Sequence, residues 1–360
     1  MVIDGLVADL DYLVSCESPS HDVEALERCA DRVGTLAARR IGHLPEVLRV
    51  DNRPHLRWTF GSPRVLLLGH FDTVWPTGTL ARWPFAVDGD RASGPGAFDM
   101  KAGIVQLFAA LEQLSALDGI AVLITSDEEI GSPTSQKLIE STARDVHATL
   151  VLEPSSDGAL KLARKGVGMY HLDVVGRAAH AGLEPERGIN ATIEAAAQIL
   201  AIHRLSDPSA GTTVTPTVVA AGTVSNTVPA AARVTVDVRA ESVDEMQRVD
   251  AGLQSLSPTV PGAVVKVVAE TVRPPLEPRW SESLFAQARS LAPGIGIADL
   301  AGVAVGGGSD GNLTAAIGIP TLDGLGAVGG NAHAEGEWVS VSAMPPRTNL
   351  VTALIRELLG

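Results

Sequence analysis

Three short apolar runs predict the buried strands of one parallel sheet. They lie at residues 65–68, 120–125 and 148–152, where apolar residues follow one another without the alternation of a half-exposed strand. Helical periodicity is present at residues 3–16, 22–38, 101–116 and 281–290, and again from about residue 341. Because strands and helices alternate, we expect an α/β domain whose mostly parallel sheet is sandwiched between helices.

The middle of the chain follows a different pattern. Alternating apolar and polar positions predict strands at residues 167–175, 213–223, 231–239 and 263–270, and helical periods fall at 189–204 and 242–256. This order is βαββαβ, the ferredoxin-like α+β arrangement. Since the first pattern resumes afterwards, we expect a discontinuous domain of residues 1–165 and 276–360, interrupted by an inserted domain of residues 166–275.

Acidic and imidazole side chains follow the predicted buried strands. His70 and Asp72 come after the first strand, Glu128 and Glu129 after the second, and Glu153 after the third. Parallel strands of an open sheet place such residues at one edge, where ligands bind. With Asp99, at the start of a predicted helix, and His333, near the end of the chain, the set suits zinc or another borderline divalent cation. It is too rich in acids for one cation, but it suits two that share a carboxylate.

Each member of this set also has an ordinary explanation. The His70-Phe71-Asp72 segment is short enough to be a polar turn, and Asp99 can be a helix N-cap. Adjacent glutamates at a strand end can form a solvated turn. The metal-site interpretation therefore rests on the three strand ends taken together.

Composition limits the partners. The net charge is −14, which disfavours nucleic acid and anionic membranes. The two cysteines, Cys16 and Cys29, have no metal-site spacing and are expected to be reduced. No apolar run is long enough to span a membrane, and the first residues carry acids where a secretory signal has basic residues. We therefore expect a cytoplasmic protein.

Seven segments together resemble a known enzyme family. They are GHFDTV, GPGAFDMKAG, SDEEIGS, LEP, GRAAHAG, NTVP and HAEGE, in this order along the chain. The pattern resembles the two-zinc metallopeptidases, which include glutamate carboxypeptidases of the carboxypeptidase G type, aminoacylases, acetylornithine deacetylase and succinyl-diaminopimelate desuccinylase. ARWPFAVDGDRASGPG and GGGSDG are most similar to the glutamate carboxypeptidase branch.

The resemblance implies a role for each strand-end residue. His70 and Glu153 would hold one zinc, Glu129 and His333 the other, and Asp99 would bridge both. It also implies that the Asp99–Met100 peptide bond is cis. Co²⁺ and Mn²⁺ are candidate substitutes for zinc, and the sequence does not choose among the three metals.

Two further acids would take part without binding zinc. Asp72 would orient His70 through its second ring nitrogen. Glu128 would be the general base on the metal-bridging water.

The resemblance also assigns residues of the inserted domain, which would serve as a lid and dimerisation domain. His180 would stabilise the oxyanion in the active site of a partner subunit, which implies a homodimer. Asn226 would contact substrate. Arg239 and Arg273 match arginines of the glutamate carboxypeptidase branch, and arginine suits a carboxylate. As an alternative, either arginine can be an ordinary surface or salt-bridge residue.

These residues predict a hydrolase. It would cleave an amide bond to release a C-terminal amino acid, glutamate for preference, from an N-acyl or peptide substrate. The alternative enzyme is an N-acyl-amino-acid deacylase of the acetylornithine deacetylase or aminoacylase type. A non-catalytic binding module of the same fold would have to lack a ligand or the base, and all of them are present.

Overall fold

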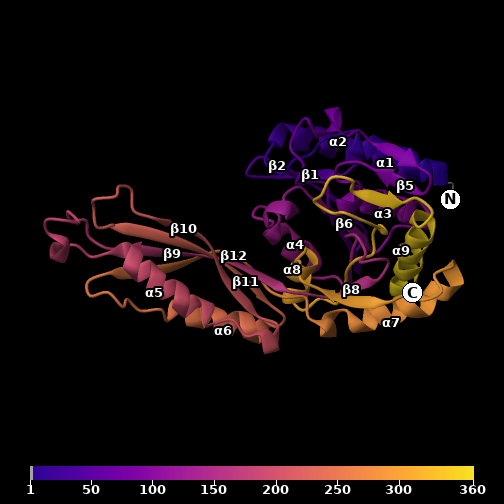
Figure 1. Ribbon diagram of the computed structural model, residues 1–360. Helices are drawn as coiled ribbons and strands as arrows, with labels where there is room; N and C mark the ends of the chain where they lie inside the picture. Colours follow the sequence, from indigo (N-terminus) through magenta and orange to yellow (C-terminus); the bar gives the residue numbers. More distant parts are fainter. Residues whose placement is uncertain (1–2) are drawn as a thin grey trace. The chain divides into compact units, whose positions relative to one another are not determined.

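The computed structural model describes residues 3–360, which form two compact units. The first unit contains the chain up to Ala163, together with Glu277–Val305 and Ser309–Gly360. The second contains Arg164–Leu276 and Gly306–Gly308 (Figure 1).

A six-stranded sheet runs through the first unit, in the order β1-β2-β6-β3-β7-β14. The strands β6, β3, β7 and β14 are parallel, whereas at one edge β2 pairs antiparallel with β6 and β1 pairs antiparallel with β2. The bounds of these strands are β1 Glu46–Val50, β2 Arg53–Phe60, β3 Val65–His70, β6 Ile120–Thr125, β7 Ala148–Val151 and β14 Thr321–Leu322. The predicted mostly parallel sheet is therefore confirmed.

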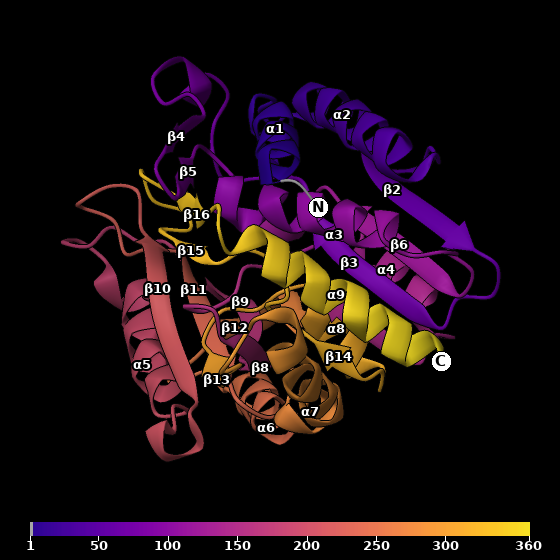
Figure 2. The ribbon, with the colours of Figure 1, turned by 90° about the vertical axis from the view of Figure 1, so that its right-hand side faces the viewer.

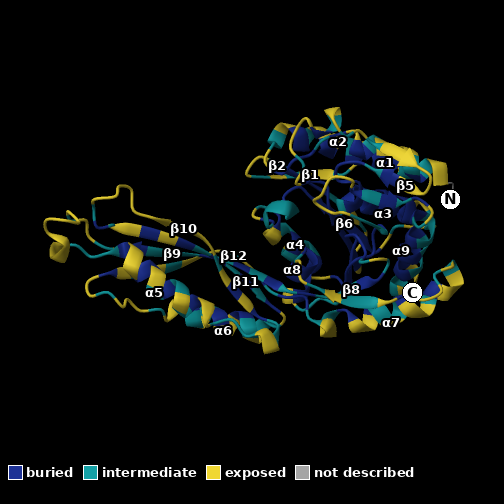
Figure 3. Cartoon of the chain, viewed as in Figure 1, coloured by how far each residue is buried: buried dark blue, intermediate teal, exposed yellow. Residues whose placement is uncertain are grey.

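Helices cover both faces of this sheet, as Figure 2 shows for α3, α4 and α9. The helices of the unit are α1 Ile3–Val14, α2 Val23–Ile41, α3 Ala102–Glu112, α4 Gln136–Ala143, α7 Glu282–Leu291, α8 Gly311–Ala316 and α9 Met344–Leu359. Alternate residues of β3 enter two separate cores. Val65 and Leu67 pack with α1, α2, α3 and α9, whereas Leu66 and Leu68 pack with α4 and α8. Burial on both faces explains the unbroken apolar run of this strand. Figure 3 shows the same burial for the neighbouring strand β6.

Several short strands of the first unit were not predicted. They are β4 Ala86–Asp88, β5 Arg91–Ser93, β8 Leu160–Arg164, β15 Gly329–Gly330 and β16 Trp338–Ser340. Four of them form a small sheet in the order β15-β16-β5-β4, and β8 pairs with β13 Gly302–Val305. Most are too short to show a period of two, and two of them, β4 and β5, lie between the predicted strand at 65–68 and the predicted helix at 101–116.

The second unit is a four-stranded antiparallel sheet with two helices. Its elements are β9 Gly166–Val175, α5 Ala191–His203, β10 Thr213–Ala221, β11 Ala231–Ala240, α6 Val243–Gln254 and β12 Val264–Arg273. The strand order is β10-β11-β9-β12, which is the predicted ferredoxin-like arrangement. Alternate residues of β9 and β11 pack against α5 and α6. The opposite face carries charged pairs such as Arg233 with Asp173.

Two glycines of the first unit allow close packing beside the end of β7. A Cβ atom on Gly103, in the first turn of α3, would lie 2.1 Å from the carbonyl oxygen of Leu152. A Cβ atom on Gly326 would lie 2.2 Å from the same oxygen. Both positions therefore require glycine, and the backbone that leads to Glu153 is held between them. Position 102 of the same helix accommodates alanine, which is buried there.

We expect Gly103→Ala to destabilise the protein by about 1–3 kcal/mol, the usual cost of overpacking a core against backbone. Urea unfolding would measure this cost as a lower midpoint at unchanged slope. Gly5→Ala in α1 is the matched control, because the added Cβ meets only Arg40 Nη2 at 3.5 Å and helix propensity favours alanine there by about 1 kcal/mol. A Gly103→Ala midpoint no lower than that of the control would contradict the prediction.

Candidate metal centre

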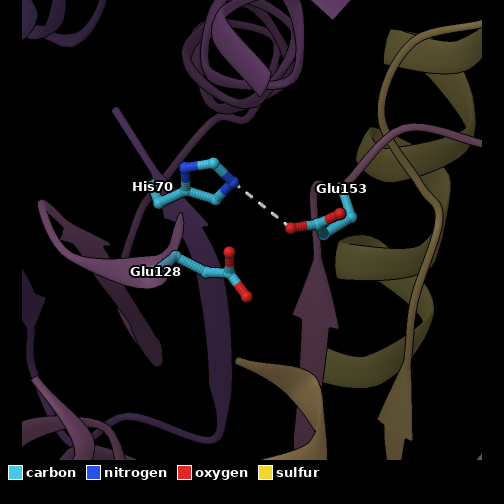
Figure 4. A group of neighbouring side chains, drawn as sticks. All are labelled: His70, Glu128 and Glu153. Carbon is cyan, nitrogen blue, oxygen red and sulfur yellow. Dashed lines mark ion pairs between the residues drawn. The ribbon is translucent and has the colours of Figure 1, made fainter. Parts of the chain in front are cut away.

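The parallel pairing of β3 and β7 brings His70 and Glu153 together. Leu68 lies opposite Val151 in this pair, so both side chains emerge just beyond the same register position. His70 Nε2 lies 3.3 Å from Glu153 Oε1, and both residues are buried. Figure 4 shows the imidazole and the carboxylate facing each other. A polar residue just after each of two paired parallel strands is thus enough to bring these two side chains together.

Asp99 faces two histidines with its two carboxylate oxygens. It lies in the turn Ala97–Lys101 before α3, and the Asp99–Met100 peptide bond is cis, as expected. Asp99 Oδ1 lies 3.3 Å from His70 Nε2, and Asp99 Oδ2 lies 3.4 Å from His333 Nε2. A carboxylate with one oxygen directed to each side has the geometry to bridge two cations.

His333 and Glu129 form the other half of the cluster. His333 comes from the segment between β15 and β16, where its backbone is left-handed with φ 61°. Its Nε2 atom lies 3.1 Å from Glu129 Oε2. Glu129 stands in the single 3₁₀ turn Glu128–Ile130 that follows β6. The side chain of His333 is 52% exposed, so this half of the cluster is open to solvent whereas His70 is enclosed.

Three buried ligand-type atoms of this cluster lack a hydrogen-bond partner, which fits a metal ion. Among residues 3–360, His70 Nε2, Asp99 Oδ1 and Glu129 Oε1 are buried atoms without a hydrogen-bond partner. One ligand atom from each of these three residues lies within 4.8 Å of the others. Buried polar atoms are almost always paired in folded proteins, so three such atoms facing one another indicate a ligand. Imidazole nitrogen and carboxylate oxygen are donors that Zn²⁺ accepts.

The electrostatics of the cluster favour a charged Asp99 and protonated imidazoles, whereas burial raises the pKa of Glu129. Burial opposes ionisation of Asp99, but the adjacent imidazoles of His333 and His70 hold its pKa well below its usual range. Burial also opposes a charge on His70, yet the neighbouring carboxylates, Asp72 first among them, raise its pKa well above normal. Hydrogen bonds to Asp99 and Glu129 raise the pKa of His333 to about 10. The carboxylates thus stabilise positive charge here, in the form of a proton or of a cation.

Glu128 lies beside the buried half of the cluster. Ligand atoms of Glu128, His70 and Glu153 lie within 4.8 Å of one another, and Figure 4 shows the three side chains converging. This geometry suits a third ligand as well as a general base. The assignment of Glu128 as the base therefore stays a prediction.

Asp72 supports the site in two ways, of which only one was expected. His70 Nδ1 lies 3.0 Å from the backbone carbonyl of Asp72 and 3.4 Å from its carboxylate. The orientation of His70 thus involves the main chain of Asp72 as well as its side chain. The carboxylate also accepts the backbone N–H groups of Glu128 and Glu129, both at 3.2 Å, and the hydroxyl of Ser20 at 2.7 Å. Asp72 therefore anchors the turn that carries two other site residues.

Two residues near the cluster were not singled out from the sequence. Lys161 Nζ lies 3.9 Å from Glu153 Oε2, from a strand too short to predict. Glu337 is fully buried and accepts hydrogen bonds around Asp99. The HAEGE segment contains Glu337, but nothing in its pattern distinguishes a buried acid from the solvated Glu335.

The second unit places His180 next to the segment of Asn226. His180 pairs with Thr227 in an isolated β-bridge, and the Ala181 N–H donates to the Asn226 carbonyl at 2.9 Å. Both His180 and Asn226 are exposed. His180 Nδ1 accepts the N–H groups of Gly182 and Leu183, each at 3.1 Å. The ring proton must therefore reside on Nε2, which is a hydrogen-bond donor.

Arg239 and Arg273 share one face of the second sheet. Both lie opposite Val167 of the central strand β9, Arg239 from β11 and Arg273 from β12. Directly opposed residues point to the same side of a sheet, so the two arginines flank Val167. Arg239 pairs with Asp237 at 3.0 Å, and Arg273 is buried. The sequence could identify each arginine but not their common register position.

Within the described part of the chain, residues 3–360, no helix has the length and apolarity that a membrane span requires.

Two solved structures have the same fold as this chain. The aminopeptidase PepT from Bacillus cereus superposes with a TM-score of 0.77 at 20% identity, over 100% of both chains. The M20 family metallo-carboxypeptidase Sso-CP2 from Sulfolobus solfataricus gives a TM-score of 0.75 at 15% identity, over 99% of this chain and 98% of that one.

Sequence comparisons show the family. Carboxypeptidase G2 from Pseudomonas sp. is 33% identical over 316 residues, which are 83% of this chain and 74% of that protein. Succinyl-diaminopimelate desuccinylase 2 from Shewanella loihica is 31% identical over 54% of this chain and 58% of that protein. The sequence model of Peptidase family M20/M25/M40 matches residues 66–357. The chain therefore belongs to Peptidase family M20/M25/M40 and is a hydrolase that acts on amide bonds.

Proposed function

We propose that this hydrolase binds two zinc ions and releases a C-terminal amino acid, glutamate for preference, from an N-acyl or peptide substrate. The observation that carries the two-metal proposal is the position of Asp99, whose two oxygens face His70 and His333 separately. Similarity to carboxypeptidase G2 over most of the chain supports carboxypeptidase action. The alternative is a deacylase of N-acyl amino acids, and the similarity to a desuccinylase is the observation in its favour.

The proposed ligands divide between the two halves of the cluster. His70 and Glu153 would hold one ion, Glu129 and His333 the other, and Asp99 both. Bound zinc lowers the pKa of water and polarises a carbonyl group. Co²⁺ and Mn²⁺ accept similar donors and are candidate substitutes.

Glu128 is the proposed proton carrier. Its carboxylate lies beside His70 and Glu153, and its backbone is fixed by the carboxylate of Asp72. In this role Glu128 takes a proton from the attacking water and returns it to the nitrogen of the leaving amine. A carboxylate beside the reacting water can accept a proton and later donate it during one turnover.

His180 is the proposed oxyanion donor, acting on a partner subunit. Its Nδ1 atom is occupied by two backbone N–H groups, so its Nε2–H is the group that can donate to a developing negative charge. The homodimer that this role requires would form through the second unit. Its edge strand β10 exposes Val218 and Val219, with exposed fractions of 60% and 53%.

Arg239 and Arg273 are the proposed carboxylate-binding residues. They flank one position of β9 on the same sheet face. Guanidinium groups bind carboxylates with two parallel hydrogen bonds, and a glutamate product carries two carboxylates. Asp237 holds the Arg239 guanidinium in place at 3.0 Å.

We expect Glu128→Gln to lower kcat by about 10²-fold or more while the metal content is unchanged, because it removes the proton carrier and no proposed ligand. Elemental analysis of the purified variant and its kcat on an aroyl-glutamate substrate would measure both quantities. Glu129→Gln is the matched control on the next residue, and we expect it to lose metal. Loss of metal from Glu128→Gln would instead make Glu128 a ligand.

The partner-subunit role of His180 predicts complementation. His180→Ala and Glu128→Gln are each expected to be nearly inactive. Mixed dimers of the two would combine an intact Glu128 from one chain with an intact His180 from the other. After reassembly from equal amounts, the mixture should recover about one quarter of wild-type activity, because half of the dimers are mixed and each has one complete site. If His180 acts within its own chain, no activity returns.

The arginine assignment predicts a substrate-dependent effect. Arg239→Lys keeps the charge but loses paired hydrogen bonding, so we expect KM for an aroyl-glutamate to rise about tenfold or more and kcat to change less. Arg233→Lys, on the same strand and sheet face, is the control. Initial rates of Arg239→Lys and Arg233→Lys on aroyl-glutamates and on N-acetyl amino acids would give KM and kcat for each variant. Faster hydrolysis of N-acetyl amino acids by the wild type would favour the deacylase alternative.

A further inference from the structure

We infer that Glu337 is a positioning residue that sets the place of Asp99 between the two halves of the metal centre. The inference rests on the proposed function, because it concerns the same site. Glu337 is not one of the proposed ligands, and it has 0% exposure. Its carboxylate lies under the turn that presents Asp99.

Four N–H groups surround the Glu337 carboxylate. Oε1 accepts the backbone N–H groups of Phe98 at 2.7 Å and Asp99 at 2.9 Å. Oε2 accepts the backbone N–H of Gly96 at 3.1 Å and the indole N–H of Trp75 at 2.8 Å. Both oxygens are therefore engaged twice, and the carboxylate is a hydrogen-bond acceptor for a turn and not a ligand for a metal ion.

These four bonds connect three segments, each of which carries a proposed ligand. Trp75 follows His70 by five positions, and Glu337 follows His333 by four. The third segment contains Asp99 itself, whose own N–H is one of the donors. A single buried carboxylate thus links the chain near His70, the chain near His333 and the residue proposed to bridge them.

The main chain fixes Glu337 independently of its side chain. Its carbonyl accepts the N–H of Gly94 at 3.3 Å, and the next residue, Trp338, pairs with Ser93 between strands β16 and β5. The carboxylate consequently starts from a fixed Cα position. Hydrogen bonds from backbone N–H groups to a carboxylate are stronger than neutral ones.

Among the described residues, Glu337 is the acceptor for the N–H groups of Phe98 and Asp99 in this turn. Residues Ala97–Lys101 form a π-helical turn in which Asp99 and Met100 have non-helical backbone angles. The Asp99 and Phe98 N–H groups therefore lie outside the helical hydrogen-bond ladder of α3 and depend on Glu337. Without this acceptor, the direction of the Asp99 carboxylate toward both His70 and His333 loses its support.

The test is the variant Glu337→Gln, which keeps the shape of the side chain but turns one acceptor into a donor facing N–H groups. The probe is Co²⁺ added to the metal-free full-length protein. We expect the visible absorption spectrum of the Co²⁺ protein to change and the affinity for at least one of two Co²⁺ ions to fall about tenfold or more. In the zinc protein we expect kcat to fall with KM nearly unchanged, because no substrate-binding residue is altered.

Glu194→Gln is the matched control for a merely structural effect. Glu194 is also fully buried and accepts the backbone N–H groups of Thr259 and Val260 together with the Gln198 amide. It belongs to the second compact unit, which contains none of the proposed ligands. We expect Glu194→Gln to lower the thermal midpoint to a similar extent, with the Co²⁺ spectrum and affinities unchanged.

The outcomes separate the two proposals. If the wild-type protein binds no Co²⁺ or Zn²⁺, or binds only one ion, the two-metal function fails before any variant is compared. If the wild type binds two ions and Glu337→Gln keeps the wild-type spectrum, affinities and kcat, the positioning role of Glu337 is wrong and the function stands. Should Glu337→Gln not fold, Trp75→Phe, which removes one of the four donors, is expected to give a smaller change in the same spectrum. An unchanged spectrum in Trp75→Phe would then overturn the inference.

Discussion

Negative charge gathered at one edge of a sheet is the constraint on which this structure depends. Carboxylate oxygens of Asp99 and Glu129 lie within 4.8 Å, and so do those of Glu128 and Glu153. At such a distance two unit charges repel by about 3 kcal/mol at an effective dielectric constant of 20. The two histidines offset part of this repulsion, and their raised pKa values show how strongly the site attracts positive charge. Divalent cations offset it more fully, which makes a metal centre the natural state of this arrangement.

Other carboxylates keep the ligands in place by accepting backbone N–H groups. Asp72 accepts those of Glu128 and Glu129, and Glu337 accepts those that surround Asp99. Both of these acids are fully buried. A ligand in an irregular turn would otherwise have several orientations, because no strand or helix ladder fixes its backbone. One set of acids is thus proposed to face the cations, and a second set holds the turns that carry the first.

Sequence reasoning could predict those features that depend on local pattern. The unbroken apolar runs predicted β3, β6 and β7, and the polar residues that follow two of these runs include His70 and Glu153. Asp99 and His333 are different, since one resembles a helix cap and the other lies in an exposed loop. Their chemistry alone placed both in the candidate set, the resemblance to a family gave each a role, and the fold brings them to 3.4 Å. The common register of the two arginines at Val167 depends on bulges and pairings that no single strand encodes.

Glu337 and the short strands were beyond prediction for a shared physical reason. β5 and β16 have three residues each, so neither contains enough positions to show a period of two. Their pairing nevertheless fixes where the backbone of Glu337 lies relative to the turn of Asp99. A polar side chain becomes a buried acceptor only after segments far apart in the chain have met. Residues that support a site are therefore harder to predict than its ligands, because a ligand needs the right chemistry at a strand end whereas a support needs a long-range pairing.

The residues proposed for hydrolysis and those proposed for substrate recognition lie in different compact units. All proposed ligands and the proposed base lie in the first unit, whereas His180, Asn226, Arg239 and Arg273 lie in the second. The chemistry of amide hydrolysis is the same for many substrates, so the first unit has little freedom to vary. In the proposed function, recognition of the released amino acid depends instead on side chains of an antiparallel sheet, where a substitution on the open face leaves the helix-covered core intact. Substrate preference can therefore change in this fold without any change at the metal centre.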